Sequence, residues 1–352
     1  MRNYTYKSLA LSIAALALAV MPARADLVLN ATGIADGFGV SNFVTGLANT
    51  GAPFGQGPFG ATVVSNGSGG FNVLVGNFAD ATLRIYDDSN GQLLTTVNNF
   101  QPYAEGFATL NGVAYGGNGS QYGSFDPNTG AFTPLAIAGL PAPSLGMAAD
   151  NATGELIAFS NNGLIAINPT TNSFRTINSG IFGDGVSVSP DGQTVYAEVG
   201  GNILGYDVHT GAQTFTAPLP GGSYSPDGTG VISSNNALNG DIIVNDNFGN
   251  VYLIDPSANG GLGSIALIGT NGDGFGSERG DFTTPDFTNG TLLMDFSDQI
   301  ERLSCGTGCA IGSTNTGVPE PSSSLLLLGV ALAGVAGWSR RRRGAVGCVR
   351  AE

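Results

Sequence analysis

The feature that most constrains this chain is a short motif that recurs along its length. In each copy an apolar run ends in Asp or Asn, a tight turn rich in Pro, Asn, Thr and Gly follows, and a second strand-like run begins. The aligned carboxylate or amide recurs at steps of 39, 42, 39 and 48 residues, at Asp87, Asp126, Asn168, Asp207 and Asp255. A repeat of about 40 residues that contains only strands and tight turns is typical of β-propeller blades.

The strand pattern predicts an all-β fold, a β-propeller of six four-stranded blades. The first complete blade is expected at residues 60–97, and a degenerate last copy at residues 280–303 lacks a fourth strand. We expect residues 27–30 to supply that strand, because closing the ring removes the exposed sheet edge. If residues 27–58 instead form a blade of their own, the count rises to seven.

Part of the repeat resembles a known group of bacterial propellers. Residues 185–196 read GVSVSPDGQTVY and residues 203–211 read ILGYDVHTG, a pattern similar to the YVTN, NHL and streptogramin-lyase-like propellers. The resemblance covers about residues 60–303 and implies the fold but no activity. The chemistry of the lyases is attributed to a histidine in the central channel, whereas His209, the sole histidine, is expected in a solvent-facing turn.

The amino terminus predicts a secretory signal peptide at residues 1–25, with a signal helix. Arg2 and Lys7 supply positive charge ahead of an apolar core at residues 9–20. Ala23 and Ala25 place small residues where a signal peptidase reads them, so cleavage is expected before Asp26. The propeller domain is then expected to occupy residues 26–316.

The carboxyl terminus combines three parts in a fixed order. An apolar run at residues 325–338, an expected transmembrane helix, separates two short motifs, Val318, Pro319, Glu320, Pro321 and Arg340, Arg341, Arg342, Arg343. Arginines after an apolar segment hold its end in the cytoplasm. Residues 317–343 resemble a PEP-CTERM sorting signal, followed by a cytoplasmic extension at residues 344–352. The alternative is a simple C-terminal anchor helix.

The sorting resemblance implies a partner and an address. Its partner is an exosortase-type membrane protease, and the carrier is expected to be a Gram-negative, exopolysaccharide-producing bacterium. The protein would pass through the inner membrane and reach the cell surface or the extracellular matrix. Before processing, the C-terminal segment would hold it in the membrane.

Charge excludes one class of partner. Residues 26–317 contain four arginines, no lysine and 24 of the chain's 26 acidic residues, so the formal charge of this span is −20. Such a surface repels nucleic acid and anionic lipid. It suits neutral glycans or divalent cations, or serves solubility alone.

Two cysteines close together in a Gly/Thr-rich loop form the first candidate site. Cys305 and Cys309 in an exported chain favour a local disulfide, while free thiols and a metal site are the alternatives. A metal would need two further ligands, and no other cysteine or histidine is near in sequence.

The densest polar loop, at residues 271–286, forms the second candidate site. Asp273, Glu278 and Asp281 offer oxygen ligands of the kind that calcium takes, without EF-hand spacing. The alternatives are a solvated acidic loop, a carbohydrate contact, or an acid–base pair acting on a sugar. Apart from calcium, no cofactor is expected. Tyr103, Tyr115 and Tyr122, in glycine-rich loops, are candidates for stacking on sugars.

Two functions follow from these features. The favoured one is an exported, non-enzymatic surface protein that binds or organises exopolysaccharide in a biofilm matrix, because the sequence shows no nucleophile elbow, zinc motif or phosphate loop. The alternative is a carbohydrate-active lyase or hydrolase that uses carboxylates on a propeller face. A calcium-stabilised structural module is a third reading.

Overall fold

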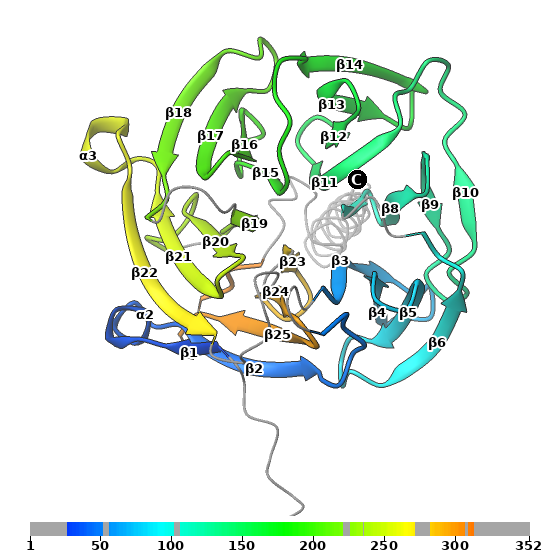
Figure 1. Cartoon of the computed structure of the whole chain (residues 1–352), viewed down its shortest axis with the longest axis horizontal. Helices are drawn as coiled ribbons and strands as arrows, with labels where there is room; N and C mark the ends of the chain where they lie inside the picture. Colours follow the sequence, from blue (N-terminus) through cyan, green and yellow to red (C-terminus); the bar gives the residue numbers. More distant parts are fainter. Residues whose placement is uncertain are drawn as a thin grey trace, which may run out of the picture. The chain divides into compact units, whose positions relative to one another are not determined.

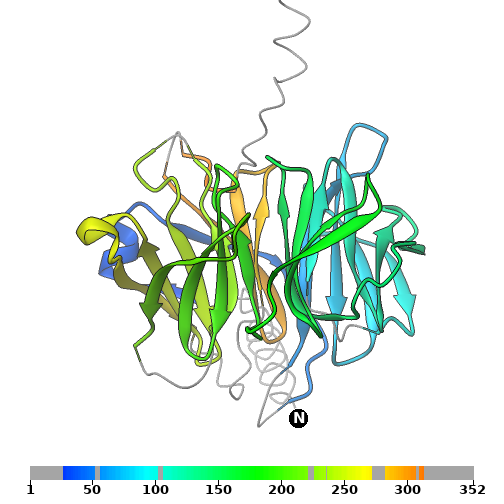
Figure 2. The same ribbon diagram turned by 90° about the horizontal axis from the view of Figure 1, so that it is seen from above.

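The strands form a ring of six antiparallel sheets. The computed structural model describes residues 27–51, 56–101, 106–220, 226–234, 236–271, 282–306 and 309–312. The chain divides into two units, residues 1–315 and 316–352, and every described residue lies in the first. In that unit six sheets surround a central axis (Figure 1), and their strands run between the two faces of the ring (Figure 2). The protein is a six-bladed β-propeller, as the repeat predicts.

Each of the first four blades uses four consecutive strands, innermost first. Blade 1 contains β3 (Pro58–Ser65), β4 (Phe71–Asn77), β5 (Thr82–Asp87) and β6 (Leu93–Asn98). Blade 2 contains β7 (Phe107–Leu110), β8 (Val113–Asn118), β9 (Gln121–Phe125) and β10 (Phe132–Pro134). Blade 3 contains β11 (Pro143–Asp150), β12 (Glu155–Ser160), β13 (Gly163–Asn168) and β14 (Ser173–Asn178). Blade 4 contains β15 (Val186–Val188), β16 (Thr194–Val199), β17 (Asn202–Asp207) and β18 (Gln213–Pro218).

The last two blades borrow strands from the amino-terminal end of the propeller. Blade 5 contains β19 (Pro226–Val231), β20 (Ile242–Asp246), β21 (Asn250–Asp255), β22 (Ser264–Asn271) and, outermost, β1 (Leu27–Leu29). Blade 6 contains β23 (Thr283–Asp286), β24 (Thr291–Phe296), β25 (Gln299–Ser304) and β2 (Gly39–Val44). Two short helical segments, α2 (Ala31–Ala35) and α3 (Ala258–Gly261), lie between strands.

The prediction that residues 27–30 complete blade 6 is wrong. Instead, β1 adds a fifth strand to blade 5, where Leu27 pairs with Asn271, and β2 closes blade 6, where Gly39 pairs with Ser304. The short helix α2 carries the chain from one blade to the next (Figure 1), and its N-cap Asn30 accepts a hydrogen bond of 3.0 Å from Gly33 N. Both strands are short and extended, so the local pattern could not decide which one pairs with which blade.

The recurrent Asp is explained by the turn that follows each third strand. Asp126 Oδ1 accepts hydrogen bonds of 2.9 and 2.8 Å from Asn128 N and Thr129 N, and Gly130 then takes a φ of 69°. Asp207 makes the same turn: its Oδ1 accepts hydrogen bonds from His209 N and Thr210 N, and Gly211 has a φ of 68°. A carboxylate or amide that caps its own turn and a glycine at positive φ make this local geometry readable from the sequence.

Six apolar clusters fill the six seams between neighbouring blades. The strand β13 shows why its sequence is apolar on both faces: all four residues 164–167 are fully buried, with a blade on either side. Blade stacking therefore accounts for the continuous apolar runs that a half-exposed sheet would not have.

The described chain ends in a closed loop. Cys305 and Cys309 form a disulfide, Ile311 is fully buried, and Gly312 makes an isolated parallel bridge to Ser233. None of the helices within the described ranges has the length and apolar character of a membrane span. The signal helix and the transmembrane helix fall outside those ranges and stay predictions.

Candidate functional site

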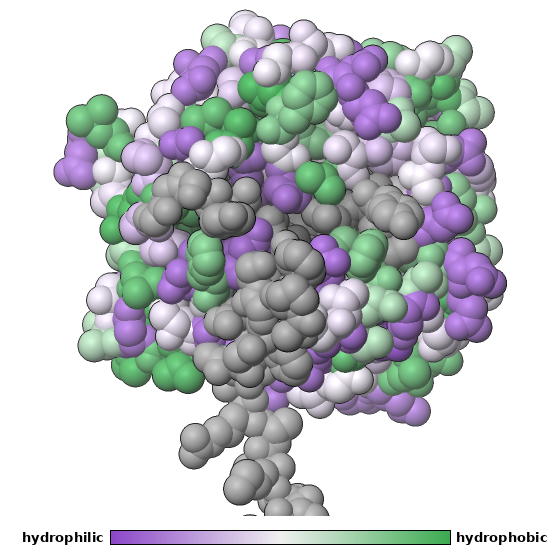
Figure 3. All heavy atoms as spheres, viewed as in Figure 1, coloured by the Kyte–Doolittle hydropathy of each residue, from purple (hydrophilic) through white to green (hydrophobic). Residues whose placement is uncertain are grey.

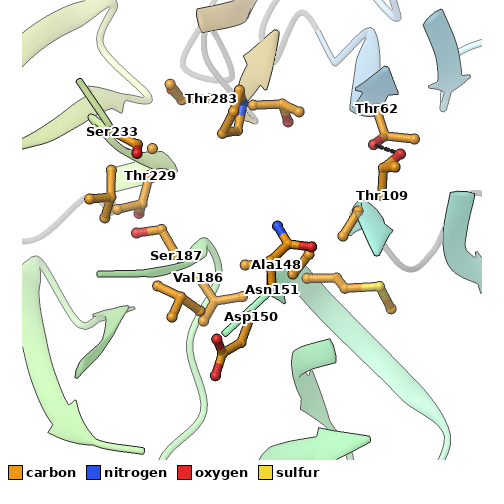
Figure 4. Close-up of a pocket in the computed structure, with 18 of the residues that line it drawn as sticks. Thr62, Thr109, Ala148, Asp150, Asn151, Val186, Ser187, Thr229, Ser233 and Thr283 are labelled. Carbon is orange, nitrogen blue, oxygen red and sulfur yellow. Dashed lines mark hydrogen bonds between the residues drawn. The ribbon is translucent and has the colours of Figure 1, made fainter. Parts of the chain in front are cut away.

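A cavity of about 130 Å³ lies on the axis of the ring. The innermost strands β3, β7, β11, β15, β19 and β23 all contribute to its wall, together with loops that follow several of them (Figure 4). Every blade thus takes part. A cavity to which all blades contribute is the default place to look for a ligand in this fold.

Much of the cavity wall is neutral and polar. Four of its hydroxyl groups belong to buried side chains, each from a different blade: Thr62, Ser187, Thr229 and Thr283. The remaining wall is largely apolar, with Ala148, among others, from blade 3. Hydroxyls interspersed with apolar side chains suit a ligand with both polar and apolar faces.

Three of the four buried hydroxyls have protein partners. These bonds join Thr62 to Thr109 at 2.9 Å, Thr283 to Asn245 at 2.5 Å, and Thr229 to Glu198. Each pair joins two neighbouring blades. These hydroxyls therefore hold neighbouring blades together and keep only part of their hydrogen-bonding capacity for a ligand.

Ser187 differs from the other three. Its side chain is 6% exposed, and its Oγ has no hydrogen-bond partner among the described residues. Val186 and Val188 flank it in β15, and all three line the cavity. A buried hydroxyl without a partner is uncommon in folded proteins and calls for an explanation.

The one carboxylate among the described lining residues is already engaged. Asp150 accepts hydrogen bonds from Ala152 N at 3.0 Å and from Thr153 Oγ1 at 2.5 Å, so it caps the turn after β11. The next side chain, Asn151, projects its amide into the cavity (Figure 4). The amide offers both a donor and an acceptor.

The opposite end of the channel is narrower. A second cavity of about 30 Å³ is lined there by Gly106, Gly146, Gly185 and Gly228. A Cβ at Gly106 would lie 2.2 Å from Met147 N, so these strands approach too closely for any side chain.

Buried carboxyl groups border this narrow end. Glu198 is 1% exposed, accepts a hydrogen bond of 3.0 Å from Gly185 N, and also accepts one from Thr229. Burial, with the neighbouring Asp184 adding to it, raises the pKa of Glu198 well above its usual value. In Asp184, which lines the same cavity, Oδ1 is buried without a partner among the described residues.

The second strands of the next two blades carry polar residues at the position that Glu198 occupies in β16. The equivalent position in β20 is Asn245 and in β24 it is Asp295, and both are fully buried. In blades 1 and 3 the position holds Gly76 and Phe159. One half of the narrow end is therefore polar, while the other is not.

Most of the site residues predicted from the sequence lie outside the described residues. These are Asp273, Glu278 and Asp281, the cleavage-site residues Ala23, Ala25 and Asp26, the motif Val318 to Pro321, and the cluster Arg340 to Arg343. Within the described ranges, no group of three or more His, Cys, Asp or Glu side chains is arranged to hold a metal ion. The calcium expectation therefore stays a prediction.

The remaining candidates fall into the core or onto the surface. Tyr122 is buried and donates a 2.6 Å hydrogen bond to Phe159 O, so the prediction that it stacks on a sugar is wrong. Tyr115 is half-buried, and Tyr103 lies outside the described residues. His209 is exposed in its turn, as predicted. On the face seen in Figure 3, hydrophilic and hydrophobic residues are interspersed around the rim.

The family comparison concerns the carboxyl terminus. Residues 317–343 match the model of the PEP-CTERM protein-sorting motif. The chain carries a PEP-CTERM motif. The motif indicates that the protein is exported and that its C-terminal sorting segment is processed by an exosortase. No curated protein matches the sequence.

Solved structures similar to this one share its fold at low identity. A gluconolactonase from Xanthomonas campestris has a TM-score of 0.57 and 14% identity, covering 80% of this chain and 96% of its own. A proposed gluconolactonase has a TM-score of 0.52 and 13% identity, with 79% and 97% coverage. The extracellular domain of a proposed one-component system from Bacteroides thetaiotaomicron gives 0.48 and 13%; the match covers 70% of this chain and 32% of that protein. Identities this low establish the propeller fold alone.

Sequence reasoning missed the residues of the central cavity. Ser187 lies in GVSVSP, part of a stretch that the sequence singled out only for its resemblance to other propellers. The available signal was positional. The residues that follow Gly106, Gly146, Gly185 and Gly228 line the central cavities, so the chemistry of these positions could have been compared blade by blade.

Proposed function

We propose that this PEP-CTERM protein is a non-enzymatic component of the cell surface or extracellular matrix that binds exopolysaccharide. The observation that carries the proposal is the central cavity, where neutral hydroxyl and amide groups alternate with apolar side chains. Sugars present the same mixture of hydroxyls and apolar ring faces. The sorting motif supports delivery to a place where such polymers accumulate.

The chemistry of the wall favours binding over turnover. Asp150 is the one ionisable side chain among the described residues that line the larger cavity, and its oxygens already cap a turn. A general base must reach the proton that it removes. His209, the chain's sole histidine, lies in an exterior turn.

The direct test incubates residues 26–317 with neutral exopolysaccharide from the producing bacterium and then measures polymer size and bound protein. Polymer of unchanged length that carries protein with it supports the proposal. Shortened chains, or the absence of binding, would overturn it. A cavity-filling variant, Ala148→Phe, should lose binding, while His209→Ala at the exterior turn serves as the matched control.

A second candidate is a carbohydrate-active lyase or hydrolase. It is favoured by two carboxyl groups near each other: Asp184 lines the narrow end, and the buried Glu198 accepts a hydrogen bond from Gly185 N beside it. The likeness to gluconolactonases is consistent with it at the level of fold. The space there, about 30 Å³, is much smaller than a sugar ring, which weighs against this reading.

The two proposed functions predict different results when carboxylates are replaced by neutral amides of the same shape. If the protein is an enzyme of this kind, Glu198→Gln and Asp184→Asn should abolish polymer shortening or lactone opening. Glu155→Gln, at the half-exposed ion pair with Arg175, is the control for loss of a carboxylate. The triple variant of Asp273, Glu278 and Asp281 to the corresponding amides tests the loop carboxylates in the same assay.

A further inference from the structure

The unpartnered hydroxyl of Ser187 distinguishes one side of the central cavity. Its three buried counterparts are tied to neighbouring blades by hydrogen bonds. Ser187 Oγ has no such bond among the described residues, although the atom is buried. A buried hydroxyl at a cavity wall is satisfied when a water molecule or a ligand atom occupies the cavity.

The charge of the lining restricts the ligand. Asp150 is the one charged side chain among the described lining residues, and its carboxylate is held by backbone and hydroxyl donors of its own turn. No Lys, Arg or His is among the lining residues that the structure describes. An anionic group such as a uronate or a phosphate would find no cation among them, so this described wall suits an uncharged ligand.

The size and enclosure of the cavity restrict the ligand further. Its volume of about 130 Å³ is roughly ten times the 10–15 Å³ that one water needs. The cavity therefore has room for a group much larger than one water, on the scale of a single sugar ring. Strands from all six blades surround it, and the glycine-lined end beyond it is too narrow for a polymer to pass through.

Building on the proposed function, we infer that the cavity binds the end of an uncharged glycan chain and accommodates its terminal sugar ring. Ser187 and Asn151 make the polar contacts to that ring, while apolar side chains such as Met147 and Val231 lie against its hydrophobic parts. The polymer is then held at its terminus and not along its length. One protein molecule then binds at each such chain end.

The first part of the test concerns Ser187. In titrations with short neutral oligosaccharides from the exopolysaccharide, Ser187→Ala should weaken binding about fivefold, the loss expected for one neutral hydrogen bond. Ser173→Ala, an exposed serine on β14, is the matched control and should bind as the unaltered protein does. Because Ser187 has no protein partner, its replacement should leave the melting temperature unchanged or raise it slightly, which separates a ligand contact from a structural role.

The second part counts chain ends. Equal masses of the same polymer, intact and cut to graded lengths, are titrated with the full propeller. Bound protein that rises in proportion to the number of ends, together with the loss in Ser187→Ala, supports the inference. Binding that follows total polymer mass and ignores Ser187→Ala overturns the inference and leaves the proposed function standing. Absence of binding at every length overturns the proposed function itself.

Discussion

Two seams of the ring are built from different chemistry. Between blades 2 and 3, where the chain runs on without interruption, described side chains form an apolar cluster, to which the Tyr122 hydroxyl adds a hydrogen bond to Phe159 O. Between blades 6 and 1, where the ring closes, Arg302 binds Asp286 at 2.9 Å and Asp88 at 2.7 Å, and lies over the Phe43 ring. Both carboxylates are buried, Asp88 to 4% exposure and Asp286 completely.

The difference reflects how strongly the contacts of each seam must determine the partner blade and the register. Neighbouring blades joined by a short connection have few alternative partners, so apolar packing is sufficient. The closing seam joins segments about 200 residues apart, where apolar packing alone would tolerate slips of register. The buried ion pairs are satisfied in a single register, because Asn289 and Thr288 also bind both carboxylates. Polar groups that fix a register in this way are known from other folds.

The largest effect is expected at the closing seam. Arg302→Met leaves Asp88 and Asp286 buried without their cation and should lower the free energy of unfolding by about 3–5 kcal/mol. Urea denaturation measures it. Arg84→Met, which breaks the less buried ion pair with Asp80, is the control and should cost at most about 1 kcal/mol. Equal losses in both variants would remove the distinction between the seams.

A smaller effect, dependent on pH, is expected at the seam between blades 4 and 5. Burial raises the pKa of Glu198, so the folded state binds a proton that the unfolded chain has already lost. The stability of the unaltered protein should therefore fall as pH rises above the ordinary glutamate pKa of about 4.3. Glu198→Gln removes this dependence, so its free energy of unfolding should exceed that of the unaltered protein at pH 9 and approach it at pH 4. A parallel pH profile for both proteins would contradict the buried-carboxyl interpretation.

Asp241, which directly precedes β20 in blade 5, provides a similar test. Burial, then repulsion from Asp255 and Asp36, raises the pKa of Asp241 to about 7. The stability of the unaltered protein should therefore fall between about pH 4 and pH 7 and then level off. Asp241→Asn should therefore raise the free energy of unfolding by about 1–2 kcal/mol at pH 8 and have little effect at pH 4. Thermal unfolding at the two pH values would show it, and equal shifts at both would contradict a raised pKa of Asp241.

The smallest effect is expected at the apolar seam. Tyr122→Phe removes the hydrogen bond to Phe159 O and leaves the ring packed, at a cost of about 1 kcal/mol. Chemical denaturation can resolve it. A loss as large as that of Arg302→Met would mean that the apolar seam depends on its polar group as much as the closing seam does.

The fold was predictable wherever it is locally encoded. Asp126 and Asp207 cap turns within a few residues of themselves, so the repeat could be read directly. The pairing of β2 with β25 joins Gly39 to Ser304 and has no local signal, which is why residues 27–30 were assigned to blade 6 instead. The cavity was missed for a related reason: Ser187 becomes distinctive only when its three counterparts are seen to have partners.

The closing strand also has a consequence for export. The strand β2 emerges early from the ribosome, yet its partner β25 ends at Ser304, so the ring cannot close until nearly the whole propeller has been synthesised. A chain that gains its final contacts this late favours export as an unfolded thread. We then expect the last fold-completing step to follow export, in an oxidising environment that would permit the disulfide between Cys305 and Cys309.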